Sequence, residues 1–358
     1  MRGPRADPPS TRTGHPIRPF QRAADAPQER RHFADPERMK ILIIKLGALG
    51  DVIMATAFVR QLCADYSTAE VWLLTVPAFA PLFMEWPGLH VHSVPRQGAL
   101  ATWRTLWWLR RQRFDRLYDL QSNGRTRVWT ALSRVPERIG NHPYFPYTLH
   151  PPQPYVGQCH AFDRINEILT CAGHRAAPPV PFLPASPRSQ SEVDHWLQAQ
   201  QLTGSPLVLL HAGASAKHPG KRWPHYLALA QALAARGLHV VWLGAAEDAA
   251  LNQALARTIG HDATSQFTVE ALAELGRRAR FAVTNDSAPM HILSCAGIPV
   301  FGLFGPTDWR RTHALGQAAR VITRDTAPSR ALCRTEERQL DRISVAMVLA
   351  KLTQSGVI

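Results

Sequence analysis

Two stretches of the sequence constrain this fold most. In each of them an apolar run is followed by a polar turn and then by a helix-like pattern. Residues 280–283 form one apolar run, and TNDSAPMH follows at 284–291, with Ser287 as a candidate N-cap. Residues 40–45 form the other, and Gly-Ala-Leu-Gly separates them from apolar residues at helical spacing in 51–64. Because the first amides of a helix lack partners inside it and carry the positive end of its dipole, both junctions are candidate phosphate sites.

Further strand and helix candidates alternate along the chain, as in a parallel, doubly wound sheet. The first part has strand candidates at 70–75, 91–94 and 116–120 and helix candidates at 100–113 and 126–133. After an interruption with two proline clusters, strand candidates return at 207–210, 240–243, 281–283 and 300–304, with helix candidates at 226–236, 249–258 and 288–296. The alternation predicts an α/β protein with two Rossmann-like domains facing a cleft, because ligands of open α/β sheets bind beyond the carboxyl ends of the strands.

The expected limits of these parts follow from composition. Residues 1–38 are rich in Arg and Pro with almost no apolar periodicity, so we expect a disordered N-terminal extension before Met39, which resembles a natural start. The expected domains are residues 39–185 and residues 186–335. Residues 336–358 are expected to form a terminal helix that packs back towards the first domain.

The net charge of +14, from 41 Lys and Arg against 27 Asp and Glu, favours an acidic substrate or surface, although an Arg-rich genomic bias gives the same sign. Nucleic acid is the least favoured partner, since the charge is spread out and the aromatic residues form no stacking platform. The five cysteines are scattered without a CxxC motif, which is typical of free thiols in a reducing compartment. No apolar stretch approaches the roughly 18 residues of a spanning helix, so we expect a cytoplasmic protein.

Three features carry chemistry. Asp51 is either a helix-capping carboxylate or a general base that takes a proton from an attacking hydroxyl. The Gly- and Lys-rich segment at 211–224 is either a solvated loop or a pyrophosphate site with Lys221 or Lys217 as its point charge. It is not a Walker A loop, because Arg222 follows Lys221, and the absence of GxGxxG counts against a dinucleotide oxidoreductase.

The third feature is the junction at 284–291 itself. Asp286 could cap its turn and His291 could be a core histidine. Alternatively, Ser287 and the amides of 287–289 face the same phosphate position as the basic loop at 211–224. His291 then adds a hydrogen-bond donor one helical turn further on.

The motifs together resemble a known family. Four segments resemble the ADP-heptose:lipopolysaccharide heptosyltransferase family, whose members are inverting glycosyltransferases of GT-B architecture. The segments are MKILIIKLGALGDVIMATAFVRQL, FDRLYDLQ (114–121), HAGAS…KRWP and TNDSAPMHILSCAGIPVFGLFGPTD. The resemblance covers most of residues 39–353. It implies a nucleotide-sugar donor held mainly by the second domain and an acceptor held by the first. The implied acceptor is an anionic lipid-linked oligosaccharide at the inner face of the cytoplasmic membrane, and no metal or other cofactor is implied.

The resemblance also implies roles for single residues. Asp51 matches the proposed base and Lys221 the lysine of the phosphate loop; these two are the candidate catalytic residues. The candidate donor-binding residues are Gly50, Ser215, Lys221, Glu247 (ribose), Asp286, Ser287, Ala288 and His291, and the candidate acceptor-binding residues are Gln121 and Arg125. Ala288 stands where the family usually has Gly, so the resemblance implies the donor class more firmly than the sugar.

A basic aromatic stretch at 103–113 is suited to a membrane interface, although core packing with solvated arginines gives the same pattern. Two other functions remain open at this stage. One is a glycosyltransferase of the same fold that uses another nucleotide sugar. The other is a catalytically silent nucleotide-sugar-binding scaffold.

Overall fold

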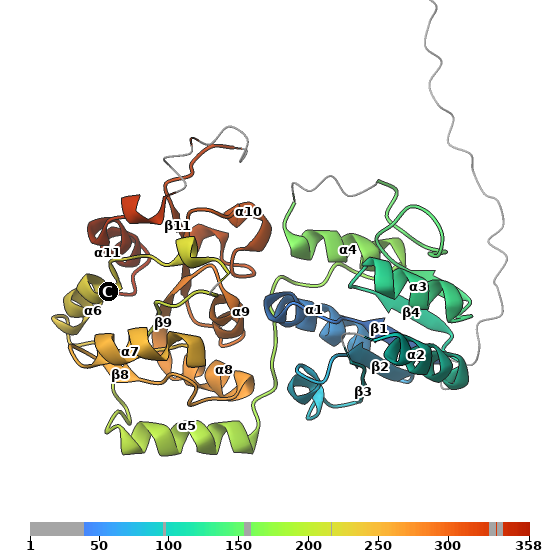
Figure 1. The fold of residues 1–358 in the computed structure, drawn as a ribbon, viewed down its shortest axis with the longest axis horizontal. Helices are drawn as coiled ribbons and strands as arrows, with labels where there is room; N and C mark the ends of the chain where they lie inside the picture. The colour runs from blue at the N-terminus through green and yellow to red at the C-terminus, as the bar shows by residue number, and fades with distance from the viewer. Residues whose placement is uncertain (1–38, 96–97, 154–158, 216, 329–333, 335–338) are drawn as a thin grey trace, which may run out of the picture. The chain divides into compact units, whose positions relative to one another are not determined.

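The apolar runs at Lys40 and Leu207 each become a central strand of a parallel sheet in the computed structural model, which describes residues 39–95, 98–153, 159–215, 217–328, 334 and 339–358 (Figure 1). The extension expected at 1–38 lies outside the described residues. Helices alternate with the strands throughout, which confirms the predicted α/β class and the pair of Rossmann-like sheets. No helix in the described part of the chain is both long and apolar enough to span a bilayer.

The sheet of the N-terminal half has the strand order β3-β2-β1-β4-β5, with every pairing parallel. Its strands are β1 (Lys40–Ile44), β2 (Glu70–Thr75), β3 (Leu89–Ser93), β4 (Arg116–Asp119) and β5 (Glu137–Ile139). Its helices are α1 (Leu49–Asp65), α2 (Ala99–Gln112), α3 (Gly124–Leu132) and α4 (Ala161–Cys171). In register, Ile41 of β1 aligns with Val71 of β2 and with Arg116 of β4.

Side chains of β1 explain why this sheet is covered on both faces. Ile41 and Ile43 join one apolar cluster with residues of α1 and α4, whereas Leu42 and Ile44 join another with Leu109 of α2 and residues of α3. Since successive side chains of a strand point to opposite faces, a strand that is apolar throughout must be buried on both sides. The continuous run at 40–45 therefore requires the two helical layers.

The sheet of the C-terminal half has the order β11-β10-β9-β6-β7-β8, again all parallel. Its strands are β6 (Leu207–His211), β7 (His239–Trp242), β8 (His261–Asp262), β9 (Ala279–Asn285), β10 (Val300–Phe304) and β11 (Val321–Thr323). Its helices are α5 (Pro187–Ala199), α6 (Tyr226–Ala234), α7 (Ala249–Ala256), α8 (Val269–Arg277), α9 (Ala288–Ser294), α10 (Trp309–Thr312) and α11 (Val345–Gln354). Val208 and Leu210 face α6 and α11, and Leu207 and Leu209 face α5, α8 and α9.

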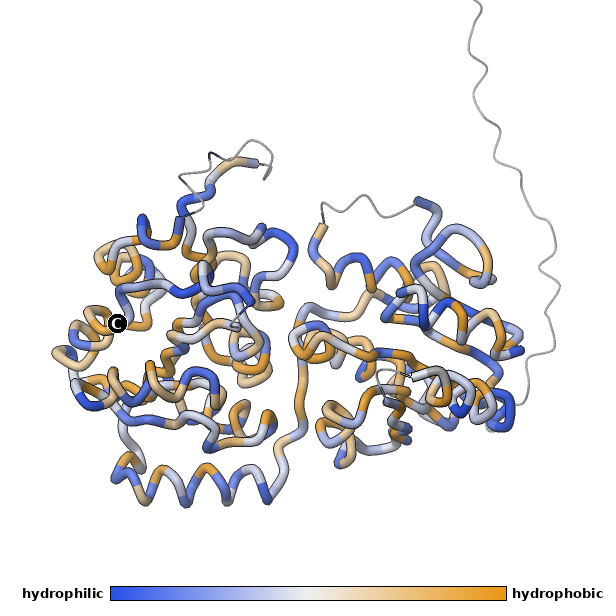
Figure 2. The backbone as a smooth tube through the Cα atoms, in the orientation of Figure 1, coloured by the Kyte–Doolittle hydropathy of each residue, from blue (hydrophilic) through white to orange (hydrophobic). Residues whose placement is uncertain are grey.

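One expectation about the helices was wrong. The terminal helix α11 packs on α6 through Val348 and Leu352, inside the apolar cluster of the C-terminal half, rather than towards the first half. The sequence reasoning assigned no helix to α5, which begins at Pro187, where the missing N–H costs nothing, and is capped by Ser186. Figure 2 shows α5 alternating between hydrophobic and hydrophilic residues along its length. The domain limits at 185 and 335 stay a prediction.

The strand orders also determine where ligands can bind. In the N-terminal half the order reverses between β1 and β4, and in the C-terminal half it reverses between β6 and β9. Ligands of open α/β sheets bind at such switch points, beyond the carboxyl ends of the two diverging strands. Asp51 follows β1 and Gln121 follows β4, while His211 ends β6 and Asp286 follows β9, so both switch points carry polar residues.

Candidate functional site

A cavity of about 320 Å³ lies at the switch point of the C-terminal sheet. It is lined by His211, Ala214, Ser215, His218, Lys221, Ala245, Glu247, Asp248, Asp286, Ser287, Ala288 and Pro289. Six of the eight residues expected to bind a donor therefore share one cavity, although they come from three separate loops. Lys217, the alternative to Lys221, is exposed and does not line this cavity.

An ion pair holds the basic loop against the junction after β9. Lys221 Nζ lies 2.7 Å from Asp286 Oδ2, and the Thr307 hydroxyl donates to the same carboxylate oxygen at 2.6 Å. A lysine ammonium has three donors, so the pair with Asp286 leaves Lys221 able to donate to an anion in the cavity as well. Thr307 was missed by sequence reasoning, although its place directly after β10, at the same edge of the sheet, was a usable signal.

The start of α9 offers fewer amides than expected. Residues 287–289 were predicted to present three N–H groups, but Pro289 has none, so only the amides of Ser287 and Ala288 remain. The Ser287 hydroxyl does not cap the helix. It lies 3.0 Å from His211 Nδ1 and 3.3 Å from the Asn285 carbonyl oxygen.

His291 does not line the cavity, contrary to its expected role as a further donor. Its ring is buried, Nδ1 has no hydrogen-bond partner among the described residues, and burial lowers the pKa of His291 against the opposing charges of Asp286 and Asp51. The ring packs on Gly50, where an added Cβ would lie 2.6 Å from His291 Cδ2. His291 and Gly50 therefore form a packing contact between α9 and α1.

Asp51 lines a second cavity, of about 220 Å³, at the switch point of the N-terminal sheet. The lining residues are Lys45, Asp51, Met54, Leu120, Gln121, Ser122, Asn141, Ala161, Arg164, Ile165, Ile168 and Arg311. Asp51 Oδ2 also accepts from the Ala48 amide at 3.3 Å, so this carboxylate both caps α1 and faces a cavity. Gln121, expected to bind the acceptor, shares the cavity and accepts from the Leu46 amide at 3.0 Å.

Lys45 is the site residue that sequence reasoning missed most clearly. It is almost fully buried, Nζ donates to the Leu120 carbonyl at 3.3 Å, and burial lowers the pKa of Lys45 although Asp51 and Asp119 act to raise it. A lysine at the end of an otherwise apolar buried strand was the available signal. Together with Arg164 and Arg311 it makes the surroundings of Asp51 cationic.

Arg125 and Gly50 are placed elsewhere. The Arg125 guanidinium lies over the Trp129 ring at 5.4 Å and donates to the Pro95 carbonyl at 3.5 Å, so it does not line the cavity with Asp51. Gly50 lines neither cavity. The two candidate catalytic residues, Asp51 and Lys221, also lie in different cavities, yet the charges of both act on His291.

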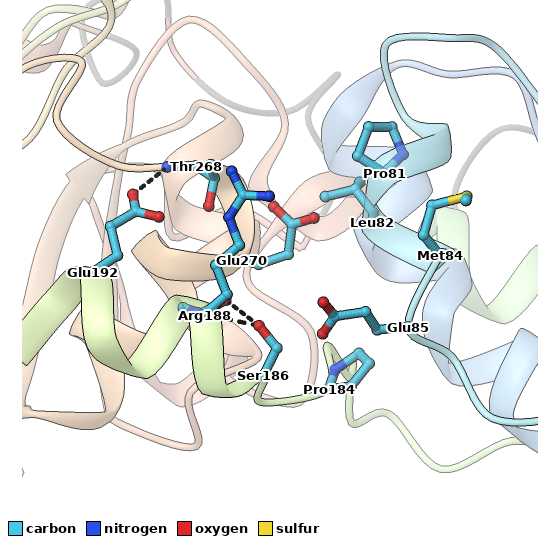
Figure 3. A pocket seen from close by; sticks show the side chains of 11 residues that line it. Pro81, Leu82, Met84, Glu85, Pro184, Ser186, Arg188, Glu192, Thr268 and Glu270 are labelled. Carbon is cyan, nitrogen blue, oxygen red and sulfur yellow. Dashed lines mark hydrogen bonds between the residues drawn. The ribbon is translucent and has the colours of Figure 1, made fainter.

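A third cavity, of about 420 Å³, is unsuited to a phosphorylated ligand. Figure 3 shows Glu85, Glu192 and Glu270 around it, with Arg188 as the cation among the labelled side chains. Glu192 accepts from the Thr268 amide at 3.2 Å. None of the expected site residues lines this cavity, and in the described part of the chain no group of three or more His, Cys, Asp or Glu is arranged to hold a metal ion.

Comparison with known proteins agrees with this geometry. Residues 172–341 match the model of glycosyltransferase family 9 (heptosyltransferase). The lipopolysaccharide heptosyltransferase 2 of Salmonella typhimurium is 29% identical over 317 residues, which cover 79% of this chain and 88% of that protein.

Solved structures of low sequence identity share the fold. A family 9 glycosyl transferase from Veillonella parvula superposes with a TM-score of 0.75 at 21% identity, covering 88% of this chain and 96% of that one. The ADP-heptose lipopolysaccharide heptosyltransferase II of Escherichia coli superposes with a TM-score of 0.70 at 23% identity, covering 88% and 98%. With its motifs, its two parallel sheets and these relatives, the chain resembles the heptosyltransferases of glycosyltransferase family 9, and it is a glycosyltransferase of GT-B fold.

Proposed function

We propose that this protein transfers heptose from ADP-heptose to an inner-core acceptor of lipopolysaccharide, with inversion at the anomeric carbon. The observation that carries this proposal is the pair of cavities at the two switch points, one holding Lys221 and Ser287 and the other holding Asp51. The activities in the names of the relatives from Salmonella typhimurium and Escherichia coli support the choice of sugar and acceptor.

The proposed reaction is a single displacement. Asp51 takes the proton of an acceptor hydroxyl, the hydroxyl oxygen bonds to the anomeric carbon, and the bond from that carbon to the diphosphate breaks on the opposite face. Lys221 and the amides of Ser287 and Ala288 stabilise the charge that develops on the departing diphosphate, and Glu247 holds the ribose. No step assigned to these residues uses a metal ion.

The acceptor is proposed to be anionic because of the cations around Asp51. Lys45, Arg164 and Arg311 share the cavity with the proposed base, and a carboxylate or phosphate on the acceptor would offset the cost of burying Lys45. Gln121 lines the same cavity and orients neutral groups of the acceptor. The oligosaccharide of a deletion strain, measured by mass spectrometry, should end one heptose earlier than that of the wild type.

Donor choice is tested by isothermal titration calorimetry with ADP-heptose, ADP-glucose and UDP-glucose. The proposal expects ADP-heptose to bind at least about tenfold more tightly than the others, because base and sugar are both recognised. A preference for UDP-glucose would instead indicate a transferase of the same fold that uses another nucleotide sugar.

Catalysis is tested by replacing the proposed base. Asp51→Asn should lower transfer at least about a hundredfold while donor affinity stays within about twofold, because the base acts on the acceptor and lies outside the donor cavity. Glu270→Gln is the matched control, since Glu270 is also a carboxylate in the first turn of a helix but lines the third cavity. Donor binding without any transfer by the wild type would support a silent scaffold.

We also propose that α2 makes a peripheral contact with an anionic membrane surface. Its outward face carries exposed apolar side chains towards the N-terminus, Leu100 (71% exposed), Trp103 (70%) and Trp107 (53%), and exposed arginines towards the C-terminus, Arg110 and Arg111. Tryptophan favours the level of the lipid headgroups, and arginine pairs with their phosphates. This arrangement fits an acceptor that is anchored in lipid.

Vesicle sedimentation tests this contact. The double variant Trp103→Ala/Trp107→Ala should bind vesicles of phosphatidylcholine and phosphatidylglycerol at least about tenfold more weakly than the wild type. Met84→Ala is the control, because Met84 is equally exposed at 70% but lies in the N-terminal half outside α2. Equal binding by the double variant and the wild type would exclude α2 as the membrane contact.

A further inference from the structure

Three polar side chains that line the donor cavity, those of His211, Asp248 and Ser287, have no role in the function proposed so far. His211, the last residue of β6, is buried, with Nδ1 3.0 Å from Ser287 Oγ and Nε2 3.7 Å from Asp248 Oδ2. Asp248 is also buried, and its Oδ1 has no hydrogen-bond partner among the described residues. The three side chains come from β6, the loop after β9 and the turn after β7, so the tertiary fold alone brings them together.

The local packing indicates a built arrangement. A Cβ added to Gly213 would lie 2.2 Å from Asp248 Cγ, so a residue with a side chain at position 213 would displace the carboxylate from His211. Asp248 Oδ2 also accepts from the Ala245 amide at 3.3 Å, and Arg222 lies 3.6 Å from Oδ1. Burial acts to raise the pKa of Asp248, but the contacts with His211, Ala245 and Arg222 hold it below its usual value, so the carboxylate is charged.

The proton position on His211 decides what Ser287 offers to the cavity. When the imidazole is neutral, Asp248 favours the proton on Nε2, so Nδ1 accepts and the Ser287 hydroxyl turns its hydrogen away from the cavity. Its other acceptor is the Asn285 carbonyl at 3.3 Å. When the imidazole is charged, Nδ1–H donates to Ser287 Oγ, and the hydroxyl hydrogen is free for a phosphate oxygen.

We propose that His211 is a proton-linked positioning residue for the donor diphosphate, and that donor binding is coupled to proton uptake at His211. This inference rests on the proposed function and adds to it a pair, His211 and Asp248, that acts through Ser287. The bound diphosphate favours the charged imidazole. The Nδ1–H group of charged His211 donates a hydrogen bond to Ser287 Oγ, and this strengthens the hydrogen bond that the Ser287 hydroxyl makes to the anion.

The groups around His211 have both signs, so the linkage is specific to this histidine rather than to the net charge of the site. The negatively charged groups are Glu247 and Asp286, which line the cavity, and Asp248, which contacts His211. The positively charged groups are Lys221, which lines the cavity, and Arg222, which contacts Asp248. The His218 ring also lines the cavity. The residue of β9 aligned with His211 is the uncharged Thr284. His195 of α5 is an exposed histidine of the same half that does not line the donor cavity, and it therefore provides the control.

The test is calorimetry with ADP-heptose and ADP-glucose from about pH 6 to about pH 9, in buffers of different ionisation enthalpy. The pyrophosphate of a nucleotide sugar does not titrate in this range, so any proton taken up belongs to the protein. Wild-type affinity should fall roughly tenfold across the range, the value of one charge-assisted hydrogen bond, and by linkage the proton uptake should reach about half a proton where the affinity changes most steeply with pH.

Four variants separate this linkage from a structural role. His211→Asn retains a polar group near Nδ1 without the charge and should bind with the high-pH affinity of the wild type at every pH, without proton uptake. Ser287→Ala should lose the pH dependence in the same way. Asp248→Asn lets neutral His211 donate from Nδ1, so it should bind independently of pH with the low-pH affinity. His195→Asn, on α5 and outside the donor cavity, should behave as the wild type.

The outcomes distinguish the inference from the proposed function. Tight wild-type binding without proton uptake, or uptake that persists in His211→Asn, overturns the role of His211 and leaves the donor assignment intact. Absence of binding of either nucleotide sugar to folded wild-type protein at any pH overturns both.

Discussion

Replacing Gly50 by alanine tests the packing of α1 on α9, which holds the proposed base next to the donor half. The added Cβ would lie 2.6 Å from Cδ2, 3.1 Å from Nε2 and 3.3 Å from Cγ of the His291 ring. Carbon atoms in contact prefer about 3.5–4.0 Å, and the ring is only 6% exposed, so it has little room to withdraw.

The expected magnitude follows from two opposing effects. Overpacking by one methyl group in a close-packed site costs about 1–3 kcal/mol. Alanine gains at most about 1 kcal/mol over glycine from helix propensity, and less in the first turn, where Gly50 lies. Gly50→Ala should therefore lower the free energy of unfolding by about 1–2 kcal/mol, or the melting temperature by a few degrees.

Urea denaturation of a double-mutant cycle measures this contact. Combined with His291→Ala, the Gly50→Ala change should become neutral or stabilising, which corresponds to a coupling energy of about 1–3 kcal/mol. Gly124→Ala is the control, because Gly124 begins α3 and a Cβ there would meet nothing within 4 Å. The reasoning is refuted if Gly50→Ala destabilises the wild type and the His291→Ala background equally.

Three further changes have defined outcomes. Lys221→Gln should weaken nucleotide-sugar binding by about 10- to 100-fold in calorimetry, because a charge-assisted contact is lost and Asp286 keeps its charge; unchanged affinity would exclude Lys221 from the phosphate site. Tyr147→Phe removes the hydroxyl that donates to the fully buried Asp119 at 2.6 Å, and the free energy of unfolding in urea should fall by about 1–3 kcal/mol; no change would mean that water replaces the hydroxyl. Burial lowers the pKa of His160 from 6.5 to about 4, so the unfolded chain binds the proton first and stability should fall by up to about 3 kcal/mol as the pH drops through that interval. His160→Asn, which can still cap α4, should flatten this slope in pH-dependent melting, and an unchanged slope would assign it to other groups.

Local pattern predicted most strands because a strand buried on both faces is apolar throughout. The runs at 40–45 and 207–210 correspond to β1 and β6, and the run at 300–304 corresponds to β10. The same reasoning missed α8, whose apolar face is interrupted by the buried Glu274. Glu274 is buried because Arg277 and Arg278 pair with it, and such pairing is not visible in a hydrophobic pattern.

The candidate donor-binding residues that follow strands of the second sheet come together because the carboxyl ends of parallel strands meet at one edge of a sheet. Ser215, Lys221, Glu247 and Asp286 all follow strands of the second sheet, and all line one cavity. His291 was misplaced since helical spacing alone does not show which neighbouring element covers a given face of α9.

The amino-acid sequence by itself determined the order of strands and helices, the two polar junctions and the family resemblance, because each depends on residues near one another in the chain. Only the tertiary structure decided that Asp51 and Lys221 lie in separate cavities, that Lys45 is buried beside the proposed base, and that α11 covers α6. These contacts join segments that the crossovers of the two sheets bring together, and their geometry depends on strand order and packing rather than on local spacing.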